Sequence, residues 1–138
     1  MSAKPSLPAG PEKKVGLRQG LLAGVITTVV NLAVWAVAKY ALAVSFLTPT
    51  PPSMELGDFN PVFIVIASLL PALLAVPVYR WLNRLSPNAF LILAIVILIA
   101  SFAMPFAMLG PADLATKLTL NLMHLVSAVG IIYLVREG

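Results

Sequence analysis

Residues Leu17–Ala43, LRQGLLAGVITTVVNLAVWAVAKYALA, form an apolar run that is long enough to cross a lipid bilayer as a helix. At about 100° per residue, its small and polar side chains fall within roughly one third of the helix circumference. The residues of this stripe are Gly20, Gly24, Thr27, Thr28, Asn31, Trp35 and Lys39. Helix interfaces in membranes are enriched in small and polar residues, because these allow close packing and hydrogen bonds between helices. We therefore expect this stripe to face protein and the remaining Leu, Val, Ile and Ala to face lipid.

The composition of the whole chain indicates that lipid is its solvent. The 138 residues are 60% hydrophobic and 10% charged, and the mean hydropathy is +0.99. A soluble domain carries about 25% charged residues, so a chain of this composition is not expected to stay in water. The sequence contains no cysteine, which excludes disulfides, thiol redox chemistry and cysteine metal sites.

Further apolar runs predict three more spanning helices, over residues 61–82, 88–109 and 114–135. Each run has about 20 residues, which matches a hydrocarbon thickness of about 30 Å at about 1.5 Å rise per residue. With the first run, over residues 17–43, they predict an all-α fold, an integral membrane four-helix bundle. We expect residues 17–138 to form this bundle as a single domain.

The segments that flank these runs are polar or rich in proline. Residues 1–16 carry lysines and prolines and are predicted to be a flexible cytoplasmic tail. Residues 44–60 contain Thr48–Pro52 and two acidic residues, and are predicted to be a loop on the outer side. Asp113 stands directly before the last run, where a carboxylate caps a helix.

The distribution of lysine and arginine predicts the orientation of the bundle. If the N-terminus is cytoplasmic, the inner side carries Lys4, Lys13, Lys14, Arg18, Arg80, Arg84 and Arg136, and the outer side carries Lys39 and Lys117. This bias follows the positive-inside rule and places both termini in the cytoplasm. The basic residues do not form a groove interleaved with aromatic residues, which argues against nucleic acid as a partner.

Charged and aromatic residues near the ends of the predicted helices are typical interface anchors. Tyrosine and tryptophan favour the level of the headgroups, and lysine and arginine extend toward it. The residues in question are Arg18, Lys39, Tyr79, Arg80, Trp81, Lys117 and Arg136. They make the lipid bilayer the first expected partner.

A row of small residues in the first helix predicts close helix packing. Gly16, Gly20 and Gly24 form two successive G-x-x-x-G units, and Thr28 extends the row. Small residues at this spacing let two backbones approach closely in lipid. The partner is either another helix of this chain or a second copy, and the pattern does not choose between them.

Asn31, Asn121 and His124 form the candidate polar site. The first helix runs outward and the last runs inward, so Asn31 and His124 lie at nearly equal depth, close to the middle of the bundle. An unpaired polar group at that depth is costly. We therefore predict a hydrogen bond between Asn31 and His124, made directly or through Asn121. It is either a structural clamp between the two helices or a midplane binding site.

The sequence lacks the residue combinations that most enzymes and cofactors need. No Asp or Glu lies within a predicted span, whereas proton-coupled transport usually uses an intramembrane carboxylate. There is no glycine-rich phosphate loop, no Ser-His-Asp set and no metal-ligand cluster around the lone histidine. We therefore expect no enzyme activity, no cofactor and no metal.

The sequence Asn-Leu-Met-His-Leu-Val-Ser-Ala at residues 121–128 carries a resemblance to a known family. Together with the glycine-rich first helix and its Asn31, it resembles an uncharacterised family of small bacterial four-helix membrane proteins. Such proteins commonly show a Met-His pair in the last helix and an Asn in the first. The resemblance covers residues 17–136, and it implies a bacterial cytoplasmic membrane location and no known activity.

Two functions are consistent with these features. The first is a non-enzymatic structural or accessory component that packs with itself or with a larger membrane complex through the glycine row and the charge-free third helix. The alternative is a binder or transporter of a small molecule or ion, with a midplane site between the first and fourth helices. That site would be centred on Asn31, Asn121 and His124.

Overall fold

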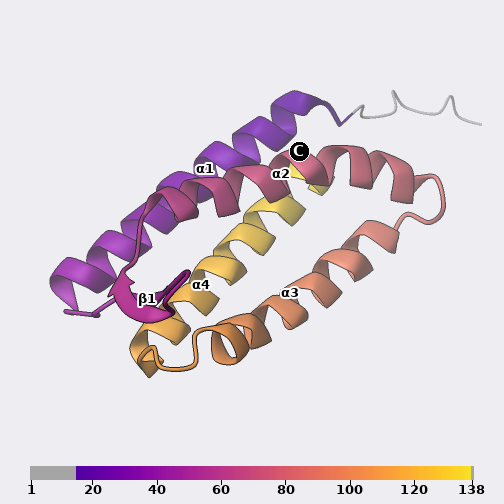
Figure 1. Cartoon of the computed structure of the whole chain (residues 1–138). Coiled ribbons are helices and arrows are strands. Elements are labelled where there is room, and N and C mark those ends of the chain that lie inside the picture. Colours follow the sequence, from indigo (N-terminus) through magenta and orange to yellow (C-terminus); the bar gives the residue numbers. More distant parts are fainter. Residues whose placement is uncertain (1–14, 138) are drawn as a thin grey trace, which may run out of the picture.

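A computed structural model describes residues 15–137, and within them four long helices run alternately up and down (Figure 1). The helices are α1 (Leu17–Ala36), α2 (Val62–Asn83), α3 (Ala89–Met108) and α4 (Leu114–Ile131). Short π-helical segments continue two of them, η1 (Val37–Ala41) after α1 and η2 (Ile132–Glu137) after α4. All four helices are long enough and apolar enough to cross a membrane. The predicted tail lies outside the described residues, except for Val15 and Gly16.

The small and polar stripe of α1 faces protein, as the sequence predicts. The buried residues of α1 are Gly20, Ala23, Gly24, Thr27 and Asn31. A Cβ atom added at Gly20 would lie 2.5 Å from Val76 Cγ2 and 3.0 Å from the Ala72 carbonyl oxygen. A Cβ atom at Gly24 would lie 3.2 Å from the Cα of Leu69. The glycines therefore let α1 lie directly on the backbone of α2, and the partner of the row is a helix of the same chain.

The two ends of the small-residue row play other parts. Gly16 is the N-cap of α1, and its N–H donates to Gln19 Oε1 at 2.8 Å. Thr28 is half-buried, and its hydroxyl donates back to the Gly24 carbonyl at 2.6 Å. Such local bonds satisfy a hydroxyl inside an apolar helix without a partner from another helix. Close packing on α2 is therefore concentrated at Gly20 and Gly24.

Helix α4 lies against another side of α1. A Cβ atom added at Gly130 would meet the Thr27 methyl group, so α4 approaches α1 closely at this level. Thr27 is 1% exposed, and its hydroxyl donates to the Ala23 carbonyl at 2.7 Å. Helix α1 is thus held by α2 on one side and by α4 on another.

Helix α3 stands apart from α2. Figure 1 shows α3 running beside α4 while its middle is separated from α2. The two helices meet near the turn that joins them, where the Tyr79 and Phe90 rings pack edge to face at 5.2 Å. Near the same end, Arg136 Nη2 donates to Asn88 Oδ1 at 3.3 Å. Away from this end, α2 and α3 diverge and leave space between them.

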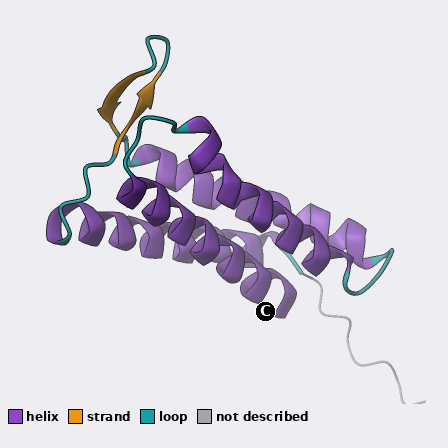
Figure 2. Cartoon of the chain, turned by 90° about the horizontal axis from the view of Figure 1, so that it is seen from below, coloured by secondary structure: helices purple, strands orange, loops and turns teal. Residues whose placement is uncertain are grey.

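The segment predicted as a loop folds into a β-hairpin, which corrects the sequence prediction for residues 44–60. Strands β1 (Leu47–Thr50) and β2 (Glu55–Asp58) pair antiparallel, with Thr48 opposite Gly57. Figure 2 shows the hairpin projecting beyond one end of the helices. An isolated two-stranded hairpin is marginally stable, so its attachment matters.

A buried aromatic side chain attaches the hairpin to the bundle. Phe46 is fully buried and lies 6.4 Å from the Trp35 ring and 6.2 Å from the Phe59 ring, measured between centroids. Its backbone N–H donates to Thr116 Oγ1 at 3.2 Å. The sequence pattern does not show this packing, because it depends on residues from three separate segments.

Asp113 caps α4, as predicted. Its Oδ1 accepts from the Thr116 N–H at 2.6 Å, and its Oδ2 accepts from the Ser45 hydroxyl. These hydrogen bonds, that from Ser45 first and those from Thr116 next, hold the pKa of the Asp113 carboxyl below its ordinary value of 3.8. The charged carboxylate therefore connects the start of α4 to the chain that leads into the hairpin.

Candidate functional site

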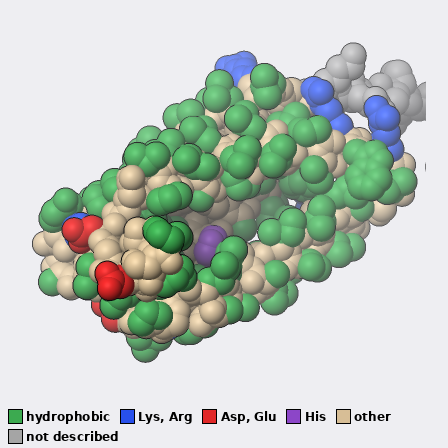
Figure 3. All heavy atoms as spheres, in the orientation of Figure 1, with side chains coloured by type: hydrophobic (Ala, Val, Ile, Leu, Met, Phe, Trp, Pro, Cys, Tyr) green, Lys and Arg blue, Asp and Glu red, His purple; other side chains and the backbone are tan. Residues whose placement is uncertain are grey.

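A cavity of about 890 Å³ lies between α2, α3 and α4. Figure 3 shows it as a hollow on one face of the molecule, with the His124 side chain inside. Pro49, Pro51 and Met54 of the hairpin line one end, and Val78 and Phe90 line the other. Its walls are mostly Leu, Ile, Met, Ala and Phe side chains. This volume is within the range of pockets that bury a small organic ligand, roughly 300–1,000 Å³.

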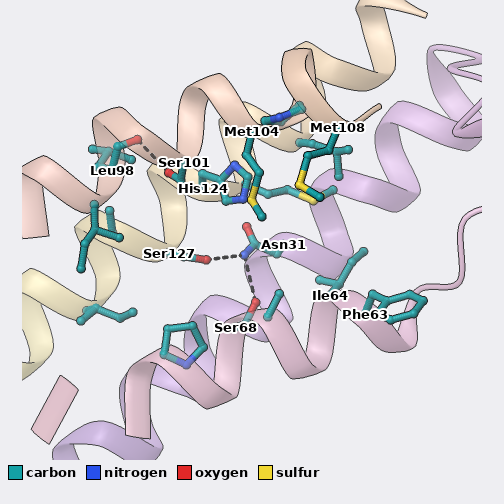
Figure 4. Close-up of a pocket in the computed structure, with 18 of the residues that line it drawn as sticks. Asn31, Phe63, Ile64, Ser68, Leu98, Ser101, Met104, Met108, His124 and Ser127 are labelled. Carbon is teal, nitrogen blue, oxygen red and sulfur yellow. Dashed lines mark hydrogen bonds between the residues drawn. The ribbon is translucent and has the colours of Figure 1, made fainter. Parts of the chain in front are cut away.

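Asn31 and His124 line the cavity at one level, which we call its polar floor. The Asn31 side chain is 2% exposed, and its Nδ2 donates to Ser127 Oγ at 2.8 Å and to Ser68 Oγ at 3.1 Å (Figure 4). These bonds join α1 to α2 and α4 at one level of the bundle. All three side chains line the cavity.

Two polar atoms at this level have no partner among the described residues. They are Asn31 Oδ1 and His124 Nδ1, both of which are buried. Figure 4 shows the Asn31 oxygen pointing away from the serines and toward the His124 ring. A buried polar group without a partner costs about 1–3 kcal/mol. Each of these atoms therefore lacks a hydrogen-bond partner that a ligand group beside it could supply.

The hydrogen bond predicted between Asn31 and His124 is replaced by the bond from Asn31 to Ser127. Ser127 lies one helical turn after His124 and fits the prediction of a polar link between α1 and α4. Ser68, which also accepts a hydrogen bond from Asn31, was not predicted from the sequence either. Its signal was that it is the one serine or threonine of α2, on the face that is buried against α1.

Asn121 is not part of the cavity lining. Its Nδ2 donates to the Phe102 carbonyl at 3.2 Å, which joins α4 to α3, and its Oδ1 is buried without a partner within residues 15–137. Of the three residues predicted to form the site, the structure brings Asn31 and His124 to one cavity and directs Asn121 elsewhere. The site also lies between α2, α3 and α4 with Asn31 at its floor, and not simply between the first and fourth helices.

The predicted anchors gather at the two ends of the bundle. Arg18, Arg80 and Arg136 lie at the end where α1 begins and α2 and η2 finish. There Arg80 Nε donates to the Val15 carbonyl at 2.6 Å, and Trp81 is exposed. Figure 3 shows the acidic side chains at the opposite, hairpin end.

Lys39 and Lys117, which the sequence predicts to be on the outer side, lie at the hairpin end. Lys39 Nζ is 5.5 Å from the centroid of the Trp35 ring, which suits a cation–π contact. Lys117 Nζ donates to the Gly110 carbonyl at 3.0 Å and lies 5.8 Å from the Phe106 ring. Both ammonium groups therefore interact near helix ends and away from the cavity.

The chemistry of the cavity is that of a neutral, apolar site. Its polar side chains are Asn31, Ser68, Ser101, His124 and Ser127, and none of its described lining residues is Asp, Glu, Lys or Arg. The Ser101 hydroxyl is used locally, because it donates to the Leu98 carbonyl at 2.7 Å. Within residues 15–137 no three His, Cys, Asp or Glu side chains group together as metal ligands.

The chain belongs to the family of unknown function DUF6069, which it matches over residues 11–138. This confirms the resemblance to a family without known function that the sequence indicates. No curated protein and no solved structure matches the chain.

Proposed function

We propose that this chain is a multi-pass integral membrane protein that binds a lipid-soluble small molecule within the bilayer. The observation that carries the proposal is the apolar cavity with unpartnered polar atoms at its floor, Asn31 Oδ1 and His124 Nδ1. Large apolar side chains are exposed along all four helices of residues 15–137, as expected for surfaces covered by lipid.

The proposed location is the bacterial cytoplasmic membrane, with both termini in the cytoplasm. This orientation is supported by four arginines that lie at one end of the bundle, because arginine and lysine are enriched on the cytoplasmic side of membrane proteins. They are Arg18, Arg80, Arg84 and Arg136. The hairpin, with Glu55 and Asp58, would then be on the outer side.

Binding without catalysis is the role that the cavity residues favour. A general acid or base needs a titratable group placed against the reacting atoms, and nucleophilic catalysis needs a nucleophile with an adjacent base. Among the described residues that line the cavity, His124 is the one titratable side chain. The hydroxyl groups of the lining serines already take part in hydrogen bonds. We therefore propose a carrier or sensor of a membrane-soluble molecule.

Native mass spectrometry of the protein, extracted with a mild detergent from the membrane of its host, tests this function. Ala94 of α3 lines the cavity, whereas Ala100 of the same helix is exposed and does not. We expect the wild type and Ala100→Trp to retain a small molecule, and Ala94→Trp to lose it because the indole fills its place. A wild-type protein that carries nothing, or an Ala94→Trp variant that retains the same mass, would contradict the proposal.

A second candidate function is an accessory subunit of a larger membrane complex or a homo-oligomer. It is favoured by α3, which carries no charged residue and exposes Ile92, Val96 and Ile99 away from the cavity. In the same experiment, a defined multimer or co-extracted subunits that Val96→Trp dissociates would favour this role. The presence of monomer alone would rule it out.

A further inference from the structure

The polar floor of the cavity defines the chemical class of the ligand, and this inference rests on the function proposed above. We infer that the cavity selects a neutral, lipid-soluble molecule that carries a hydroxyl group, and that this group sits between Asn31 Oδ1 and His124 Nδ1. Apolar arms of the molecule would then occupy the cavity on either side of the hydroxyl.

Asn31 requires a hydrogen-bond donor from the ligand. Its side-chain amide has two N–H donors and one carbonyl acceptor. Nδ2 donates to Ser68 Oγ and Ser127 Oγ, so both of its hydrogens are used. Oδ1 is left as a pure acceptor, buried and pointing toward the His124 ring (Figure 4). A ketone, an ether or an ester presents only acceptors and leaves this atom unpaired.

His124 makes the requirement more specific. A neutral imidazole has one nitrogen that donates and one that accepts, and Nδ1 is buried without a partner in the part of the chain that the structure describes. A hydroxyl donates one hydrogen bond and accepts others. It can therefore donate to Asn31 Oδ1 and accept from a protonated Nδ1, so that one group satisfies both atoms.

The ligand is neutral because the cavity offers nothing to balance a charge. No described lining residue is ionic, and the lysines and arginines lie near the ends of the helices. Ionised carboxylates and amines are strongly disfavoured in such surroundings unless they are paired. A fatty acid or an alkylamine is therefore a poorer ligand than an alcohol with the same chain.

The shape of the cavity places the hydroxyl between two apolar compartments. On α3 the lining extends from Phe90 to Met108, which corresponds to about 27 Å of helix at about 1.5 Å per residue. Asn31 lies between these limits, at the level of Ser127. The separation of α2 and α3 opens the hollow sideways, toward the region that lipid would occupy (Figure 3). The molecule would thus enter laterally from the membrane.

Photolabelling with three matched probes tests the inference. The full-length protein is reconstituted in phosphatidylcholine vesicles with a diazirine-bearing long-chain alcohol, the corresponding carboxylic acid or the corresponding alkane, and the labelled residues are mapped by mass spectrometry. We expect the alcohol to label cavity residues such as Ile97 and Met104 about tenfold more than either other probe. Unlabelled alcohol should compete with this labelling.

Two variants and one control test the polar floor. His124→Phe removes Nδ1 without breaking a hydrogen bond of the described residues, so it should fold and lose most of the preference for the alcohol. Asn31→Leu should lose the preference as well; if it fails to fold, His124→Phe carries the test. The control is Asn121→Leu, which removes an amide outside the cavity and should keep the preference.

The possible failures are distinguishable. If no probe labels the cavity residues, the proposed binding function falls together with the inference. If the alkane or the acid labels them as strongly as the alcohol, the cavity still binds lipid-soluble molecules and the inference alone is wrong. A folded His124→Phe protein that keeps the full preference for the alcohol would also contradict the position that we infer for the hydroxyl group, between Asn31 Oδ1 and His124 Nδ1.

Discussion

Helix α2 meets two neighbours in very different ways. Toward α1 it presents Ala72, which is fully buried, and the glycines of α1 let the two backbones lie close together. Toward α3 it presents Pro71, Leu74 and Phe63, which line an open cavity. The two faces belong to the same 22-residue helix.

The difference shows what decides helix contact in an apolar chain. Lipid tails are as apolar as leucine, so hydrophobicity alone does not pull two helices together in a membrane. Small residues permit close van der Waals packing, and α1 supplies them where α3 supplies Ile, Leu, Phe and Met. The packed face then stabilises the bundle, and the open face lines the cavity that we propose as the binding site.

The largest expected effect comes from breaking the packed face. Gly20→Leu would place side-chain atoms where Val76 Cγ2 and the Ala72 carbonyl lie, and we expect a loss of about 3 kcal/mol in unfolding free energy. Thermal unfolding in detergent, followed by circular dichroism, measures it. The control is Gly110→Leu, because no atom lies within 4 Å of the Cβ position at Gly110. Equal stability of the two variants would refute close packing of α1 on α2.

The same substitution on the two faces of α2 sharpens the comparison. Ala72→Leu adds bulk at a site with 0% exposure, and we expect it to cost about 2 kcal/mol. Ala67→Leu adds the same bulk on the cavity side and should change stability by less than about 0.5 kcal/mol. Both values come from unfolding in urea and detergent. A large loss for Ala67→Leu would mean that the cavity is closed in the folded protein.

Asn31 connects the two faces, and its loss should have a smaller effect. Asn31→Ala leaves the Ser68 and Ser127 hydroxyls without their partner, and we expect a cost of about 1 kcal/mol. Hydrogen exchange should then rise in α2 and α4 near both serines. The triple variant that also carries Ser68→Ala and Ser127→Ala should recover part of the loss. Absence of any such coupling would argue against the hydrogen-bonded link.

The smallest expected effect is a pH dependence at the hairpin end. The hydrogen bonds from Ser45 and Thr116 lower the pKa of the Asp113 carboxyl below 3.8, so the folded state binds this proton less readily than the unfolded state. The resulting stability is present above pH 3.8 and is lost as the pH falls through the lower folded pKa. Unfolding curves between about pH 6 and about pH 2 measure it. The difference between wild type and Asp113→Asn should shrink toward acid, and a constant difference would contradict the assignment.

The glycine row and the polar stripe show how far the sequence alone reaches. Gly20, Gly24 and Asn31 are spaced for one face of a helix, so their burial could be predicted from helical periodicity. Their partners could not, because Val76 and Ser68 carry no local signal that points to α1. The hairpin was missed for the same reason, since Phe46 is held by residues of distant segments.

The sequence by itself determined the four apolar runs of residues 15–137, the helix face of α1 that must be covered and the cap of α4. These are local properties, set by side-chain type and by a period of 3.6 residues. Only the tertiary structure decided that α1 packs on α2, that α3 diverges and leaves a cavity, and that Ser127 takes the place of His124 as the partner of Asn31. Those outcomes depend on which helices fit closely enough to touch, and the fit is a property of paired surfaces that one segment does not contain.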